Sequence, residues 1–235
     1  MKAKLFSLIF ITLLISCEKQ EIIFDYPITL ISEEIQVLSE IKVYTMNGEI
    51  VNTDVINEFI KYDTRDYFFV NSDTIVKIKQ HDTITYQDKD TVIFYEHGLQ
   101  NPLNSQIKRT PKKEGDYILF NLIDTLIVTG SEDYSESILH QIGIFKPYID
   151  CYTVPFYYGG GSHCKYLNTK VAQGNPNKLE FPNLVIMLRT FQTRSFSFYM
   201  QRDFNNIFDK NVINLLEYGD TLAIQEIKTI YAKID

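Results

Sequence analysis

The residues best suited to chemistry in this chain are concentrated in one segment, Cys151–Tyr166, which reads CYTVPFYYGGGSHCKY. Thiolate sulfur and imidazole nitrogen are metal ligands, and two thiols can also form a disulfide. Three interpretations are open: a disulfide across a hairpin, a thiol or metal site that uses His163 and Cys164, or two inert buried thiols. Adjacent residues of a strand point to opposite faces, which disfavours the site at His163 and Cys164.

The chemistry of these cysteines depends on the compartment, which the N-terminus indicates. Lys2 and Lys4 precede an apolar run, Leu5–Ile15, that has the length of a signal-peptide core and falls short of the ~20 residues of a membrane-spanning helix. The run ends in LISC at Cys17, which resembles the lipobox of bacterial prolipoproteins. The resemblance implies that residues 1–16 are a signal peptide and that Cys17 is acylated. An ordinary secretory signal is the alternative, but its cleavage site prefers small residues at positions −3 and −1, and the order Ile15-Ser16-Cys17 suits the lipoprotein pattern better.

Residues 17–21, CEKQE, form a short acylated tether before the folded part of the chain. In many bacteria with two membranes, an aspartate directly after the lipidated cysteine retains a lipoprotein in the inner membrane. Glu18 stands at this position, so the resemblance implies an outer-membrane lipoprotein that contacts the membrane through its N-terminal lipid. The periplasmic and the outer face of that membrane both remain open.

With Cys17 acylated, Cys151 and Cys164 are the only other thiols of the chain. An even pair of cysteines in an oxidising envelope is most simply a disulfide. The glycines at 159–161 permit the tight reversal that would bring the two cysteines opposite each other. Closing a loop of this length stabilises the fold by about 3 kcal/mol in the chain-entropy model.

The same hairpin offers candidates for contact with a ligand or partner. Tyrosine gives a large contact area at a low cost in conformational entropy. We expect Tyr152 and Phe156 to alternate into the core, which leaves Tyr157, Tyr158 and His163 as candidates at an exposed tip.

Composition excludes some classes of protein. Removing residues 1–16 takes away Lys2 and Lys4 and leaves 21 basic against 30 acidic residues, a net charge of −9. A net acidic chain with scattered charges does not favour nucleic acid as a partner. The chain has no tryptophan, which excludes the Gly-x-Trp start of typical lipocalins. Its hydrophobic content of 45% is that of a globular protein with a sizeable core.

A recurring pattern of Asp-Thr followed by an aliphatic residue indicates strands that begin at turns. It occurs at Asp73, Asp82, Asp90, Asp124 and Asp220. Aspartate favours turns, and threonine with an aliphatic residue favours strands. The first three occurrences lie 9 and 8 residues apart, the spacing of an antiparallel meander. The predicted strands are Gln36–Thr45, Tyr67–Val70, Thr74–Lys79, Thr83–Gln87, Thr91–Tyr95, Tyr117–Asn121, Thr125–Thr129, Cys151–Tyr157, Leu184–Phe191, Ser195–Met200 and Thr221–Tyr231.

Few segments have the pattern of a helix. The segment TDVINEFIKY has apolar residues on one side and Thr53 as its predicted N-cap. The segment NVINLLEYG is similar, with Gly219 placed to end it. Residues 131–145 are ambiguous between helix and strand.

The pattern predicts a mainly β protein, an antiparallel barrel or sandwich of the meander type with two or three short helices. Residues 22–235 form a single ectodomain, since no flexible linker divides them. The polar interval 97–116 is predicted to be a long loop or a seam between two halves, and its basic residues, Arg109 among them, to be solvated.

Catalytic and cofactor motifs are absent from the sequence. There is no His-Glu-x-x-His, Gly-x-Ser-x-Gly, phosphate-binding loop or dinucleotide fingerprint. Residues 133–137, DYSES, match the Asp-x-Ser-x-Ser metal motif of von Willebrand A domains, but that motif follows a buried parallel strand. We interpret DYSES as a polar turn or helix start. We therefore expect no cofactor, no metal site and no catalytic residues, although two converging carboxylates would be invisible in the sequence.

The segments NGEIVNTDVINEFI and EYGDTLAIQEIKTIYAKI resemble uncharacterised lipoproteins of Bacteroidota-type bacteria, and that resemblance implies no function. The sequence predicts an outer-membrane-anchored lipoprotein with a non-catalytic binding role toward a ligand, a glycan or an envelope protein. The alternatives are an envelope hydrolase that acts on carbohydrate and a lipocalin-like carrier of a small apolar ligand. A carrier requires an apolar cavity. A protein that docks on an envelope partner requires an exposed aromatic patch, and a hydrolase requires a cleft in which acidic side chains converge.

Overall fold

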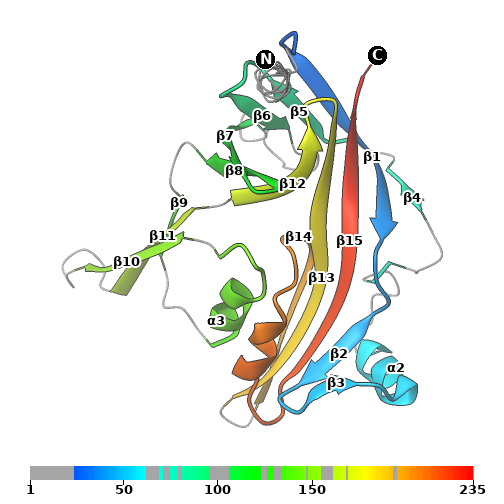
Figure 1. Cartoon of the computed structure of the whole chain (residues 1–235). Coiled ribbons are helices and arrows are strands. Elements are labelled where there is room, and N and C mark those ends of the chain that lie inside the picture. Colours follow the sequence, from blue (N-terminus) through cyan, green and yellow to red (C-terminus); the bar gives the residue numbers. More distant parts are fainter. Residues whose placement is uncertain are drawn as a thin grey trace, which may run out of the picture.

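The computed structural model describes most of the chain after its N-terminal segment (Figure 1). The described residues are 24–61, 69–70, 75–78, 81–95, 106–122, 126–129, 134–146, 148–154, 161–167, 169–192 and 195–234. Among them the chain is mainly β, as predicted, with few short helices.

Eight antiparallel strands close into a barrel, which decides between the predicted barrel and sandwich. Around the barrel each strand pairs with the next barrel strand along the chain, and β15 returns to pair with β1 (Figure 1). This order is that of an up-and-down meander. The barrel strands are β1 (Ile28–Val37), β5 (Thr83–Tyr86), β6 (Val92–Tyr95), β7 (Gln106–Glu114), β8 (Tyr117–Leu122), β12 (Thr169–Asn175), β13 (Lys178–Gln192) and β15 (Thr221–Lys233).

Aromatic rings fill one end of the barrel. Phe181 of β13 contacts Tyr231, Phe120 and Phe94, with ring centroids 5.1, 5.9 and 6.0 Å away. These rings belong to a cluster with buried aliphatic residues of β1, β5 and β6, against which Phe24 packs. Aromatic rings are suited to filling the barrel because each buries about 150–250 Å² of surface that would otherwise contact water.

The interval 97–116 contains a barrel strand, so the long-loop prediction is wrong for Gln106–Glu114. Strand β7 pairs with β6 on one side and with β8 on the other. Its Arg109 is 1% exposed, stacks 5.4 Å from the Phe94 ring centroid and donates from Nη1 to the Phe120 carbonyl at 3.0 Å. Alternation along β7 buries Arg109, which local sequence polarity did not indicate.

Strands β13 and β15 run on beyond the barrel and carry a second layer on each face (Figure 1). They continue there as a sheet with β2 (Lys42–Thr45), β3 (Gly48–Ile50) and β14 (Ser195–Asn205). On one face Met187 and Ala223 pack with Phe59 of helix α2 (Thr53–Lys61). The opposite face packs against helix α3 (Tyr134–Gln141) and the 3-10 helix η2 (Lys210–Leu215).

The helices confirm one prediction and correct two others. Residues 134–141 of the ambiguous segment are helical, so DYSES runs into a helix start. The segment NVINLLEYG contains the 3-10 helix η2, but this helix ends at Leu215 with Leu216 as its C-cap, so the prediction that Gly219 ends it is wrong. Gly219 lies in the turn before β15, with a φ of 94°. The N-cap of α2 is Asn52 and not Thr53, because the Asn52 side chain accepts from the amides of Asp54 and Val55 at 2.9 and 3.3 Å.

A small separate sheet holds the cysteine hairpin. It consists of β9 (Leu126–Thr129), β10 (Tyr148–Val154) and β11 (Gly161–Leu167), in the order β10-β11-β9. The register places Cys151 directly opposite Cys164, which confirms the predicted hairpin alignment. The two-residue strand β4 (Val76–Lys77) pairs with β1 outside the barrel.

The disulfide between these cysteines stays a prediction, which thiol counting tests. In a chain that carries Cys17→Ser, we expect no reactive thiol in denaturant without reductant and both thiols after reduction. Cys151→Ser in the same chain provides the control, since it should expose the thiol of Cys164 without reductant. Two reactive thiols in the unreduced parent chain would contradict the disulfide.

Candidate functional site

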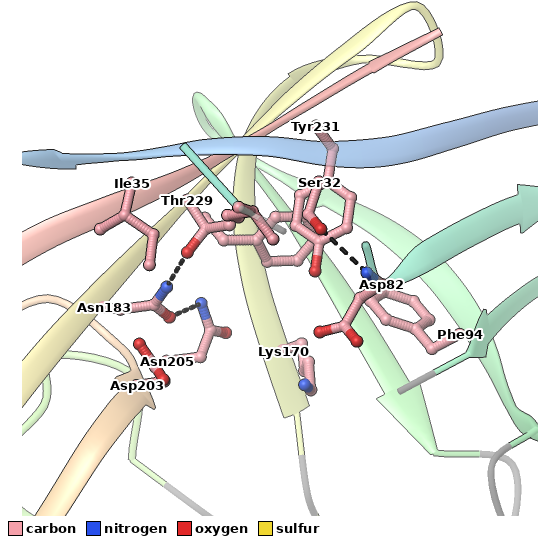
Figure 2. Close-up of a pocket in the computed structure, with 12 residues that line it drawn as sticks. Ser32, Ile35, Asp82, Phe94, Lys170, Asn183, Asp203, Asn205, Thr229 and Tyr231 are labelled. Atoms are coloured by element: carbon pink, nitrogen blue, oxygen red, sulfur yellow. Dashed lines mark hydrogen bonds between the residues drawn. The ribbon is translucent and has the colours of Figure 1, made fainter. Parts of the chain in front are cut away.

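A cavity of about 220 Å³ lies between the aromatic end of the barrel and the extended part of the sheet (Figure 2). Side chains from β1, β6, β12, β13, β14 and β15 line it, together with Asp82 and Ile78 from loops. Its lining residues are Ser32, Ile35, Ile78, Asp82, Phe94, Lys170, Phe181, Asn183, Asp203, Asn205, Thr229 and Tyr231. The barrel therefore brings together residues from almost the whole length of the chain.

The floor of the cavity is apolar and rigid. Phe94, Phe181 and Tyr231 form it, and each is buried in the ring cluster of the barrel. Their contacts with one another lock their orientations, because interlocked rings fill the interior. A bound molecule would meet ring faces on this side and polar groups on the others.

One wall of the cavity is an amide bridge between two barrel strands. Strands β12 and β13 pair only at their hairpin, from Gln173 to Glu180, and then separate. The Asn205 amide of β14 fills the gap and donates to the carbonyls of Pro182 and Val171 at 2.8 and 3.0 Å. It thereby replaces strand-to-strand hydrogen bonds that the separation removes.

The bridge continues through a second asparagine. Asn205 also contacts the Asn183 side-chain oxygen at 3.2 Å, and Asn183 donates to Thr229 Oγ1 at 2.9 Å (Figure 2). These amide and hydroxyl groups therefore form a frame that is held by hydrogen bonds within the protein. A frame of this kind is preorganised for binding.

A β-bulge places Asp203 at the cavity. In the pairing of β14 with β13, two residues, Arg202 and Asp203, oppose the single residue Val185. Asp203 has a φ of 63°, in the left-handed region that aspartate tolerates better than most residues. Bulges re-aim side chains, and this one turns the Asp203 carboxylate toward the pocket.

Two further charged groups complete the site. Asp82 is fixed to Ser32 of β1 by two hydrogen bonds, from its amide to Ser32 Oγ at 2.9 Å and from the Ser32 amide to its carbonyl at 3.0 Å. Lys170 comes from β12, and its amine lies 5.8 Å from the Phe94 ring centroid. In the view of Figure 2, Asp82 and Asp203 lie on either side of Lys170.

The electrostatic surroundings raise the pKa of the Asp203 carboxyl above its ordinary value. Desolvation in the bulge is the largest cause, and the nearby Asp82 carboxylate adds to it. Arg202 and Lys170 act in the opposite direction. Asp203 therefore interacts electrostatically with both other charged groups of the cavity.

Of the predicted contact residues, only His163 lies among the residues that the structure describes. Cys17, Tyr157 and Tyr158 lie outside the described residues. His163 lies on β11, where it pairs with Tyr152 of β10 and Thr129 of β9. The sequence did not predict the residues of this cavity. Only Asp82 belonged to a pattern noted in the sequence, the Asp-Thr pattern, and that pattern was interpreted as turn chemistry alone.

A separate aromatic patch lies at the opposite end of the extended sheet. Phe196, Phe198 and Tyr218 are 54%, 48% and 86% exposed there. Phe196 and Tyr218 border a hollow of about 430 Å³, and Arg189 lies 5.0 Å from the Phe196 ring centroid. This patch has the exposed aromatic character expected of a docking surface, but on residues other than those predicted.

No protein-family model, curated protein or solved structure matches this chain. No helix among the described residues is long and apolar enough to cross a membrane. Within the same residues, no three His, Cys, Asp or Glu side chains gather as a metal site. The fold itself defines the class: an eight-stranded up-and-down β-barrel with a cavity of mixed polar and apolar lining above an aromatic core.

Proposed function

We propose that this protein is an outer-membrane-anchored lipoprotein whose barrel binds a small polar ligand without catalysis. The observation that carries the proposal is the cavity above the aromatic core, where Asp82, Lys170 and Asp203 converge on a preorganised amide frame. Ligand sites typically combine an apolar lining with a few fixed polar groups. The lipobox-like sequence at Cys17 supports the anchor, and the few residues before β1 keep the barrel close to the membrane.

Packing and polarity favour a polar ligand over an apolar one. The interior that a lipocalin-like carrier would leave open is occupied by Phe94, Phe120 and Phe181. The remaining cavity has charged and amide walls, and an apolar molecule bound there would leave those polar groups without water.

Size favours binding over hydrolysis of a glycan. Asp82 and Asp203 are two carboxylates in one cavity, and the raised pKa of Asp203 is the direction that a general acid requires. A hydrolase, however, needs its two carboxyl groups on opposite sides of a sugar chain that passes between them. A cavity of about 220 Å³ that ends on packed rings instead suits one molecule of monosaccharide or amino-acid size.

Thermal unfolding of the detergent-solubilised full chain in the presence of small polar compounds tests this proposal. A ligand at about 100 times its Kd stabilises by about 2.7 kcal/mol, which corresponds to a rise in Tm of about 5–10 °C for a chain of this size. We expect at least one compound to produce such a rise and Lys170→Met to reduce it.

The matched control is Lys108→Met, because Lys108 is exposed on β7, a barrel strand that does not line the cavity. This variant should keep the full ligand-induced rise. An equal ligand-induced rise in Tm in both variants would mean that the ligand binds outside this cavity. Hydrolysis of an added glycan would favour the hydrolase instead.

A further inference from the structure

The aromatic hollow at the far end of the extended sheet contains a positive charge. Arg189 of β13 lines this hollow of about 430 Å³ together with Phe191, Phe196 and Tyr218. The rings of Phe191 and Phe196 pack on each other with their centroids 4.9 Å apart. The hollow therefore combines one guanidinium with a largely aromatic wall.

Neutral groups hold the guanidinium of Arg189 in place. Its Nη2 donates to Thr221 Oγ1 on the neighbouring strand β15 at 2.9 Å. Its Cζ lies 5.2 Å from the ring centroid of Phe59 and 5.0 Å from that of Phe196. Because these three partners fix the guanidinium without neutralising it, the group is preorganised to receive an anion.

One donor of the same guanidinium has no acceptor. Within the part of the chain that the structure describes, Arg189 Nε is buried and makes no hydrogen bond. A buried donor without an acceptor is costly, and such a group in a folded protein points to a bound water, ion or ligand. The two oxygens of a carboxylate match two neighbouring N–H groups of a guanidinium.

Other polar groups of the hollow are already engaged within the protein. Thr221 Oγ1 accepts from Arg189, and Thr45 Oγ1 accepts from the amide of Asn47 at 3.3 Å. Asp220 is 1% exposed, and its carboxylate accepts three hydrogen bonds. A sugar, which needs many hydrogen bonds, would therefore find few partners here, whereas a molecule with one anionic group and an apolar body matches the lining.

We propose that this hollow binds a small aromatic carboxylate, with its carboxylate at Arg189 and its ring against Phe196 and Tyr218. The site is separate from the barrel cavity, so the inference does not rest on the proposed function. Its volume falls within the range of about 300–1,000 Å³ that small-molecule sites occupy. Among the described residues that line it, Arg189 alone is cationic, which suits a carboxylate better than a doubly charged phosphate.

Isothermal titration of the detergent-solubilised full chain with benzoate, phenylacetate and hydrocinnamate tests the inference. The acid that binds most tightly is then compared with its amide, which keeps the ring and loses the charge. Acetate keeps the charge and lacks the ring. We expect the amide and acetate each to bind about tenfold more weakly or worse, since each loses one of the two contacts. D-glucuronate and phenyl phosphate should also bind more weakly than the aromatic acid.

The variants assign each end of the ligand. Arg189→Met should weaken binding of the acid about tenfold but leave binding of its amide nearly unchanged, because the amide has already lost the group that Arg189 contacts. Arg189→Lys should restore only part of the affinity, since lysine keeps the charge and loses the paired donors. Tyr218→Ala should weaken the acid and the amide alike, and its side chain is 86% exposed, so the fold does not depend on it. Lys108→Met, on an exposed position of β7, should retain full binding.

Several results would overturn this site. Equal affinity for the acid and its amide would remove the role of Arg189, and tighter binding of D-glucuronate or phenyl phosphate would overturn the ligand class. Binding that is lost in Lys170→Met and kept in Arg189→Met would place the ligand in the barrel cavity, which would support the proposed function and contradict a second site. A chain that binds none of the three aromatic acids would also overturn the inference, while the barrel cavity would keep its own test.

Discussion

Phe181→Ala should lower the free energy of unfolding by about 3–5 kcal/mol, the range found when a buried phenylalanine is truncated. Phe181 is 4% exposed and is the ring on which Phe94, Phe120 and Tyr231 converge. Alanine would leave a cavity that these rings cannot close without breaking their mutual contacts. The loss is a large part of the 5–15 kcal/mol that stabilises a typical domain.

Urea unfolding followed by circular dichroism measures this loss through the transition midpoint at an unchanged slope. Phe196→Ala is the matched control, because it removes the same ring from a position that is 54% exposed. It should cost about 1 kcal/mol or less, from the contacts of this ring with Arg189 and Phe191. Similar losses in both variants would contradict a barrel core centred on Phe181. Ligand binding should also weaken in Phe181→Ala, since Phe181 is part of the cavity floor.

Asp220→Ala should lower the free energy of unfolding by about 1.5–3 kcal/mol, since it removes a buried carboxylate that accepts three hydrogen bonds. The Asp220 carboxylate is 1% exposed and accepts from Tyr134 Oη at 2.5 Å and from the amides of Glu217 and Phe191 at 2.8 and 2.9 Å. It therefore ties helix α3 and the end of β13 to the turn before β15. The same carboxylate contributes to raising the pKa of the Tyr134 hydroxyl, after desolvation.

Asp90→Ala provides the control, because Asp90 occupies the same place in the Asp-Thr pattern but is exposed in the turn between β5 and β6. That substitution should cost less than about 0.5 kcal/mol, as is usual for surface positions. Tyr134→Phe should remove part of the Asp220 effect, and the double variant should be less destabilised than the sum of the two. Equal losses of unfolding free energy in Asp90→Ala and Asp220→Ala would mean that the hydrogen-bond network of Asp220 does not stabilise the fold.

The cavity depends on two departures from regular strand geometry. The bulge at Asp203 places a carboxylate at the cavity, and the separation of β12 from β13 makes room that the Asn205 side chain then bridges. Both are properties of strand pairing and have no pattern in the sequence that marks them.

Local patterns predicted the elements that depend on local physics. The meander strands at 83–87, 91–95 and 117–121 correspond to β5, β6 and β8, and helix α2 begins at Thr53, one residue before the start that a Thr53 cap predicts. Period-two alternation and turn chemistry specify such elements within a few residues. Strands β1, β7 and β12 were not predicted, because their inward positions include Ser32, Arg109 and Lys170, whose polarity hides the alternation.

The Asp-Thr pattern separates what sequence and tertiary structure each determine. By itself the sequence determined that Asp82, Asp90 and Asp220 precede strands, since turn and strand propensities are local. Only the tertiary structure decided that Asp90 faces solvent, that Asp220 is buried in a hydrogen-bond network and that Asp82 lines a cavity. The reason is that burial depends on which distant strands close the barrel, such as β1 against β15, and residues from both ends of the chain make that contact.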